Sequence, residues 1–218
     1  ELKDYPYRRL LISTGARAII PPVKGLDLNG IFTLRQLEDG MAVNDYVTDK
    51  KPQKGIIVGA GSIGMEMAEA FTRRGISVTI IEKAPAILGT MDDEISEVVE
   101  KELESNGVTL LKNMAVVEFT GEGPGVKRAV LEDGTSLDAD IVIIGAGIRP
   151  NAGLAGEAGI EIGETRAIKV NERMETNIPG IYAAGDCAEA YHLVYGRNVY
   201  MPLGTTANKQ GKIAGENM

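Results

Sequence analysis

The sequence has little of several residue types, and each shortage excludes a class of protein. Its 218 residues include one Cys, one His and no Trp. A single Cys cannot form an intramolecular disulfide framework, which fits a reducing compartment, so we expect a cytoplasmic protein. The longest apolar run, near residues 141–148, is less than half as long as a membrane-spanning helix, so we expect no membrane association. No metal site is expected.

Basic residues are also in the minority. Lys and Arg total 23 against 31 Asp and Glu, for a formal net charge of −8. An acidic surface repels a phosphate backbone, so we expect no nucleic-acid partner. Small anions can still bind, because backbone N–H groups need no net positive charge. Residues 1–4 lack the features of a signal peptide, and we expect both ends to be cut from a longer chain, because the sequence starts without Met and stops inside a predicted helix.

Strand and helix patterns alternate along most of the chain. This order predicts an α/β fold with a mostly parallel sheet, and the strands after Gly107 predict an added β-meander. The predicted strands are residues 7–13, 55–58, 78–81, 108–111, 115–119, 126–131, 141–144, 168–170 and 181–183. The predicted helices are residues 32–47, a helix with the apolar stripe Ile63, Met67 and Phe71, a helix with Ile95, Val98, Val99 and Leu103 on one face, and a closing helix from about Thr205.

Glycine is abundant, and its most informative cluster is the GxGxxG sequence at residues 59–64. It follows a predicted strand and opens a predicted helix, which is the context that a dinucleotide-binding βαβ unit requires. Gly59 allows the tight turn, Gly61 lets the backbone approach a pyrophosphate, and Gly64 lets the helix pack on the strand. Ser62 and Ile63 stand in the first helical turn, whose N–H groups and partial positive charge attract phosphate.

An acidic residue completes this dinucleotide fingerprint. Glu82 ends the second strand, 21 residues after Gly61. Its carboxylate can accept hydrogen bonds from both ribose hydroxyls of adenosine and would repel a 2′-phosphate, so NAD(H) is favoured over NADP(H). Lys83 weakens that preference, because a neighbouring cation can tolerate a phosphate. The alternative is a glycine-rich turn that binds nothing.

Two further glycine clusters differ from the fingerprint. Gly121, Gly123 and Gly125 lack a flanking strand and helix, so they predict a hairpin turn. Gly147 follows a predicted central strand, but Pro150 stands where a third glycine would be. The carboxyl end of a central strand is where ligands bind in α/β sheets, so Gly147 either edges a ligand or simply forms a turn.

An aspartate follows the late strand at residues 181–183. Asp186 emerges at the carboxyl end of that strand, where a carboxylate can hold a sugar or polyol hydroxyl. It can equally well cap a helix. The residues alone leave these two readings equal.

Together, several segments resemble the pyridine nucleotide-disulfide oxidoreductase family of flavoproteins. They are the fingerprint, residues 145–151 (GAGIRPN) and residues 179–186 (PGIYAAGD). Residues 12–16 (ISTGA) resemble a strand end of the family's FAD domain. Residues 202–211 (PLGTTANKQG) resemble the flavin-facing segment of the subgroup with coenzyme A-disulfide reductases and NADH oxidases. The resemblance covers essentially the whole chain.

The resemblance implies two sets of cofactor contacts. It assigns NAD(H) to Gly59, Gly61, Ser62, Ile63, Gly64, Glu82 and Gly147, and FAD to Thr14, Gly15, Asp186, Leu203, Gly204 and Thr205. It also implies a Rossmann-type NAD(P)-binding domain at residues 51–150, inserted between two parts of an FAD domain at residues 1–50 and 151–218. The closing helix would then direct its N-terminus at the flavin.

The implied reaction passes a hydride from NADH to FAD, and then electrons to a disulfide such as coenzyme A disulfide, or to O2 or peroxide. We expect no catalytic side chain here, because the family's redox Cys, its first FAD motif and its C-terminal homodimerisation segment lie outside this sequence. Cys187 is expected to be a buried structural thiol and His192 a structural or exposed residue. The alternatives are a ferredoxin or rubredoxin reductase component, or a non-catalytic NAD-binding module.

Overall fold

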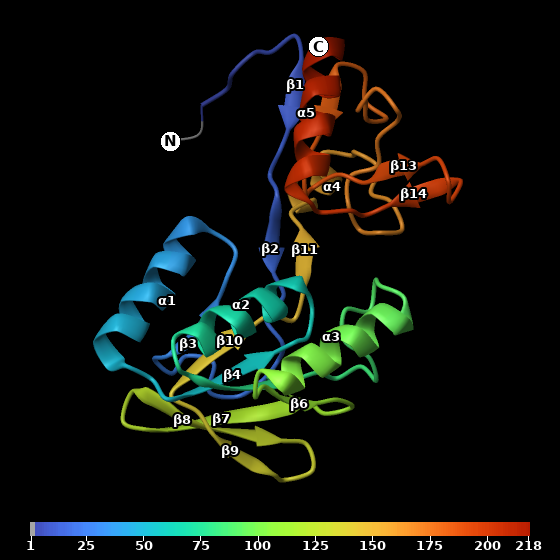
Figure 1. Cartoon of the computed structure of the whole chain (residues 1–218). Coiled ribbons are helices and arrows are strands. Elements are labelled where there is room, and N and C mark those ends of the chain that lie inside the picture. The colour runs from blue at the N-terminus through green and yellow to red at the C-terminus, as the bar shows by residue number, and fades with distance from the viewer. Residues whose placement is uncertain (1–2) are drawn as a thin grey trace. The chain divides into compact units, whose positions relative to one another are not determined.

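The computed structural model describes residues 3–218 and divides into two compact units (Figure 1). The central unit is Ala18–Gly147, and the flanking unit combines the residues up to Arg17 with Ile148–Met218. The chain passes between them along β2 (Ala16–Ala18) and β11 (Ile148–Pro150), which pair in a two-stranded sheet. In the described residues, no helix is both long enough and apolar enough to cross a membrane.

A parallel sheet forms the middle of the central unit, as the sequence predicts. Its strand order is β3-β10-β4-β5-β6, and every neighbouring pair is parallel. The strands are β3 (Ile31–Thr33), β4 (Lys54–Val58), β5 (Ser77–Ile81), β6 (Thr109–Leu111) and β10 (Ile141–Ile144). The chain leaves β4 toward β5 and β6, and returns to β10 on the other side. This reversal between β4 and β10 creates the crevice in which doubly wound sheets bind ligands.

The two faces of this sheet carry different layers (Figure 1). Successive side chains of a strand point to opposite faces, so Ile57 and Ile143 pack with the helices, while Ile56 and Val142 pack with the meander. The helices are α1 (Leu37–Lys50), α2 (Ser62–Arg73) and α3 (Asp93–Ser105), and the antiparallel meander is β7 (Val116–Glu122), β8 (Gly125–Leu131) and β9 (Ser136–Asp138). The predicted Rossmann-type unit with an added meander is confirmed.

The helix predicted over residues 32–47 is wrong at its start. Residues 31–33 instead form β3, which pairs with β10, and α1 begins at Leu37. The Asp39 carboxylate accepts hydrogen bonds from the backbone N–H groups of Arg35 and Gln36 at 2.8 and 2.9 Å. An acidic side chain that binds N–H groups before the first turn fixes the start of a helix.

The buried face of α3 also differs from the prediction. Val99 and Leu103 pack against the core, as expected. Ile95 and Val98 are exposed, at 51% and 64%, and the buried residue of the helix is Ser96. Positions 96, 99 and 103 share one face of a helix with 3.6 residues per turn, so the inward stripe is rotated from the predicted one.

The flanking unit is built around a parallel pair, β1 (Leu10–Ile12) with β12 (Ile181–Ala183). Its other elements are the short helix α4 (Gly153–Glu157), the hairpin β13 (Ala190–His192) and β14 (Arg197–Val199), and the closing helix α5 (Gly204–Asn217). The strand predicted at residues 168–170 is absent: Ile168 is buried but makes only isolated bridges to Ile162 and Ala188.

The two compact units divide at Arg17/Ala18 and Gly147/Ile148, while the cofactor-domain boundaries at residues 50/51 and 150/151 remain a prediction. Residues 18–50 belong with the central unit for a physical reason. Strand β3 extends its parallel sheet, and Val43 of α1 is buried in its core.

Candidate cofactor sites

A cavity of about 470 Å³ lies in the central unit at the carboxyl ends of β4, β5 and β10. That volume falls in the range of small-molecule pockets, about 300–1,000 Å³. The fingerprint residues Gly59 and Gly61 line it, together with Glu82 and Gly147. The structure therefore brings these four predicted residues to one cavity at the switch point of the sheet.

The three fingerprint glycines occupy different environments. Gly59 has a φ of +104°, and a side chain there would strike the Gly145 carbonyl. A side chain at Gly64 would strike the Gly59 carbonyl, so α2 approaches β4 at the distance that only glycine allows. A Cβ at Gly61 would meet no atom within 4 Å. The turn and the packing thus need Gly59 and Gly64, while Gly61 leaves open space where a ligand would lie.

Ser62 and Ile63 form the first turn of α2, after the N-cap residue Gly61. Ser62 is exposed, and Ile63 packs against the core cluster beneath the helices. The first N–H groups of a helix have no partner within the helix and attract anions. Neither side chain lines the cavity, so any ligand contact at these positions comes from the backbone.

The Glu82 carboxylate is held in place by two backbone groups. One oxygen accepts from the Ala60 N–H and the other from the Ala84 N–H, both at 2.7 Å. Each carboxylate oxygen has a second lone pair, so both oxygens can still accept a ribose hydroxyl. Lys83 is exposed beside it and also lines the cavity.

A loop over residues 83–91 forms one wall of this cavity. Leu88 has a left-handed φ of +49°, and its N–H donates to the Ala60 carbonyl at 2.9 Å. Ile87 is completely buried, and its carbonyl accepts from the Ser96 hydroxyl at 2.9 Å. The sequence patterns did not single out Ala60, Leu88 or Ser96, because their roles rest on backbone contacts that carry no residue signature.

Gly147 lines the same cavity and follows β10, which lies on the other side of β4 from β5. Its φ is +96°, and its carbonyl accepts from the Ile19 N–H at 2.9 Å. The cluster at Gly121, Gly123 and Gly125 is the turn between β7 and β8, with a φ of +65° at Gly123. The hairpin prediction for that cluster is confirmed.

In the flanking unit, Asn151 holds the end of β1. The Thr14 hydroxyl donates to the Asn151 carbonyl at 2.6 Å, and the Asn151 amide donates back to the Thr14 carbonyl at 3.0 Å. The Asn151 N–H donates to the carbonyl of Gly15, whose φ is +66°. Arg17 donates to the Asn151 side-chain oxygen at 3.0 Å. These bonds fix two of the residues that the resemblance assigns to FAD.

The other four predicted FAD residues lie at the carboxyl end of β12 and the start of α5. Because β1 and β12 are parallel, the ends of both strands lie at the same edge. The buried Gln210 of α5 accepts from the Gly185 N–H at 2.7 Å, which joins the helix to the turn before Asp186. Leu203, Gly204 and Thr205 are exposed at the N-terminus of α5.

Two cavities of the flanking unit lie apart from the predicted FAD residues. One cavity of about 610 Å³ is lined by residues such as Lys169, Glu175 and Tyr191, and by none of the six predicted FAD residues. Cys187 is buried as predicted, with its thiol near the carbonyls of Ile12 and Ala184. His192 stacks on Tyr195, with ring centroids 4.3 Å apart.

No group of three or more His, Cys, Asp or Glu side chains is arranged to hold a metal ion in residues 3–218. A carboxyl group with a lowered pKa, that of Asp138, does not line the dinucleotide cavity. A hydrogen bond from Lys54 and its charge lower the pKa of Asp138, at the edge of the meander.

The profile of the family described as "Pyridine nucleotide-disulphide oxidoreductase" matches residues 1–211. An NADH oxidase of Methanocaldococcus jannaschii is 42% identical over 97% of this chain and 47% of that protein. The structure of an NAD-dependent persulfide reductase from A. fulgidus has a TM-score of 0.91 at 38% identity, covering 97% of this chain and 39% of that one.

A third similar protein is an FAD-dependent pyridine nucleotide-disulphide oxidoreductase from Desulfovibrio vulgaris. Its structure has a TM-score of 0.87 at 37% identity, covering 98% of this chain and 54% of that one. The chain spans about half the length of the curated relatives it matches, between 47% and 49% of the first four.

Proposed function

This chain belongs to the pyridine nucleotide-disulphide oxidoreductase family, and on that premise we propose that its central unit binds NAD(H) in an FAD-dependent oxidoreductase. The observation that carries the proposal is the cavity where Gly61 and Glu82 meet. Gly61 leaves space for a pyrophosphate, and Glu82 offers two carboxylate oxygens to a ribose. The names of the M. jannaschii and A. fulgidus proteins, which mention NADH and NAD, support the same cofactor.

Several of the predicted NAD(H) residues have a defined binding task in this proposal. The N-terminus of α2, from Gly61 to Gly64, directs unpaired N–H groups and partial positive charge at the pyrophosphate. Glu82 accepts hydrogen bonds from the adenosine ribose and repels a 2′-phosphate, which favours NAD(H). Gly147 lines the same cavity. No side-chain acid or base is needed, because the cofactors supply the hydride chemistry.

The flanking unit is proposed to contribute part of an FAD site. Thr14 and Gly15 stand at the end of β1, and Asp186 stands at the end of the parallel neighbour β12, where a carboxylate can hold a ribityl hydroxyl. Leu203, Gly204 and Thr205 open α5, whose N-terminal partial charge would lie beside the flavin pyrimidine edge. The FAD-dependent relative from D. vulgaris supports this assignment.

The domain organisation proposed here is an NAD-binding unit inserted between two segments of an FAD domain, together with homodimerisation through a further segment. The electron acceptor is proposed to be a low-molecular-weight disulfide or related sulfur compound, with O2 or peroxide as the alternative. The name "persulfide reductase" of one similar protein supports the sulfur acceptor, and the name "NADH oxidase" of another supports O2 or peroxide.

Titration of the 218-residue chain with NADH and with NADPH tests the binding proposal directly. We expect saturable binding of both reduced nucleotides, with a lower Kd for NADH. Absence of saturable NADH binding would overturn the proposed function, and tighter binding of NADPH would overturn the role of Glu82 in cofactor choice.

A further inference from the structure

We infer that Ser96 is a positioning residue for the dinucleotide cavity, an inference that rests on the proposed function. Ser96 is a buried polar residue of α3, with 3% of its surface exposed. A serine inside a helix usually faces solvent or bonds to the carbonyl four residues earlier. The Ser96 hydroxyl instead donates to the Ile87 carbonyl, nine residues earlier, at 2.9 Å.

The carbonyl that Ser96 binds belongs to the peptide group between Ile87 and Leu88. The N–H of the same peptide group, on Leu88, donates to the Ala60 carbonyl at 2.9 Å. The carbonyl and N–H of a trans peptide point in opposite directions, and the described residues contain no cis peptide bond. One rigid peptide plane is therefore held between α3 on one side and the fingerprint on the other.

The same reasoning applies to the next peptide group. The Ala60 carbonyl that accepts from Leu88 shares its peptide plane with the N–H of Gly61. Fixing that carbonyl fixes the direction of the Gly61 N–H, at the start of the helix that would receive a pyrophosphate. Hydrogen bonds in such a chain also polarise one another. Ser96 thus acts on the phosphate-binding backbone through two peptide groups, without touching the cavity itself.

The left-handed conformation of Leu88 indicates that its surroundings hold this part of the loop in place. A non-glycine residue at a φ of +49° is disfavoured unless its surroundings fix it. The hydrogen bonds with Ser96 and Ala60 hold the carbonyl and the N–H of the peptide group between Ile87 and Leu88. Without the Ser96 hydroxyl, that peptide plane loses one of its two anchors.

The test compares Ser96→Ala with Ser96→Thr, which keeps the hydroxyl, in the 218-residue chain. The matched control is Ser105→Ala on the same helix, where the hydroxyl is exposed and donates to the Glu102 carbonyl. For each variant, the Kd is measured for NADH, ADP-ribose and adenosine. We expect Ser96→Ala to lose at least threefold more affinity for ADP-ribose than for adenosine, because only ADP-ribose carries the pyrophosphate. Ser96→Thr is expected to recover most of that loss, and Ser105→Ala to show none.

A second measurement needs no ligand. The exchange rate of the Leu88 amide proton, followed by NMR, should rise in Ser96→Ala and stay unchanged in Ser105→Ala. Equal losses for ADP-ribose and adenosine, or unchanged exchange at Leu88, would overturn the inference while the wild-type protein still binds NADH. A wild-type chain that does not bind NADH would overturn the proposed function and this inference with it.

Discussion

The backbone N–H of Ala60 donates to the carboxylate of Glu82 over 2.7 Å, which joins the phosphate-binding turn to the acid at the end of the neighbouring strand. The two parts of the dinucleotide fingerprint are therefore connected to each other without a ligand. Because the Ala84 N–H binds the second oxygen, the carboxylate is oriented before a ribose arrives. Such preorganisation lowers the entropy cost of binding.

Glu82→Gln tests this arrangement. An amide has one oxygen, so it can replace only one of the two acceptors and carries no charge to repel a 2′-phosphate. We expect the Kd for NADH to rise about tenfold, equivalent to about 1.4 kcal/mol, and the preference over NADPH to narrow. Titrations with both nucleotides measure the effect, with Glu104→Gln on an exposed position of α3 as the control. An unchanged ratio of the Kd values for NADH and NADPH would contradict the assignment of Glu82 to the ribose.

Gly61→Val should abolish nucleotide binding and leave the fold intact. The reason is that a Cβ at Gly61 meets no protein atom within 4 Å, so the added side chain occupies only the space meant for the ligand. The thermal midpoint and the NADH Kd are measured together. Gly125→Val is the matched control, because its Cβ also meets no atom within 4 Å but lies in β8. Retained NADH affinity in Gly61→Val would refute the proposed pyrophosphate position.

Gly64→Ala, in contrast, should lower the stability of the fold. Its Cβ would strike the Gly59 carbonyl, so α2 must move away from β4. Overpacking of this kind costs about 1–3 kcal/mol of folding free energy. Urea denaturation followed by circular dichroism should show a lower midpoint for Gly64→Ala than for Gly61→Val. Equal midpoints would mean that the helix and strand tolerate the extra methyl group.

The sequence predicts well wherever one residue type has one physical use. The apolar run at residues 141–144 is β10, and Gly59 and Gly64 occupy the environments that the fingerprint predicts. It predicts poorly where tertiary contacts decide. Phe32 fits a helical stripe, but pairing with β10 makes its segment a strand. Ser96 gives no signal at all, since a single serine in a helix predicts nothing about a carbonyl nine residues away.

The stabilisation from Asp138 should depend on pH. Its hydrogen bond and ion pair with Lys54, at 2.7 Å, lower the pKa of Asp138. A carboxyl group with a lower pKa in the folded state stabilises fully above its unfolded pKa of about 3.9. This contribution is lost as the pH falls through the folded value. Asp138→Asn should therefore be less stable than the wild type at pH 7, and the difference should shrink below about pH 4.

Urea denaturation at both pH values measures this difference. Both side chains are exposed, at 55% and 59%, so the effect should be small and should weaken in high salt. Lys54→Met, which removes the larger cause, should reduce the pH-dependent part of the Asp138→Asn effect. Arg128, whose Nε lies 3.6 Å from the other Asp138 oxygen and also lowers its pKa, accounts for the remainder. A difference that is the same at both pH values would show that the ion pair is not its source.

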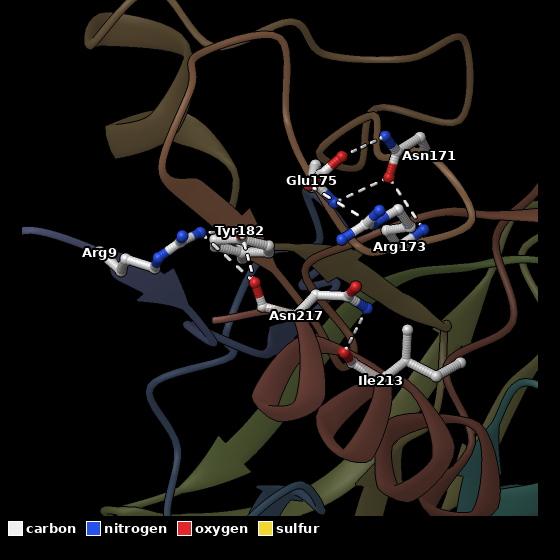
Figure 2. Close-up of polar contacts among 7 residues, drawn as sticks. All are labelled: Arg9, Asn171, Arg173, Glu175, Tyr182, Ile213 and Asn217. Carbon is white, nitrogen blue, oxygen red and sulfur yellow. Dashed lines mark hydrogen bonds and ion pairs between the residues drawn. The ribbon is translucent and has the colours of Figure 1, made fainter.

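Tyr182 connects the first strand region to the end of the closing helix (Figure 2). Its hydroxyl accepts from Arg9 at 2.6 Å and donates to the Asn217 carbonyl at 2.8 Å. That carbonyl belongs to the last turn of α5, where carbonyl groups have no partner within the helix. The Tyr182 ring is almost completely buried, with 2% of the residue exposed. One hydroxyl therefore joins β12, Arg9 and the C-terminal turn.

Tyr182→Phe keeps the buried ring and removes both hydrogen bonds. We expect the flanking unit to lose about 1–3 kcal/mol, since each net hydrogen bond contributes about 0.5–1.5 kcal/mol. Amide exchange in α5 should accelerate most in its last turn, because the Asn217 carbonyl keeps only the longer contact to Arg9, at 3.4 Å. Tyr5→Phe is the control, since Tyr5 is 77% exposed. Uniform acceleration along α5 would instead indicate that the hydroxyl stabilises the whole unit rather than the helix end.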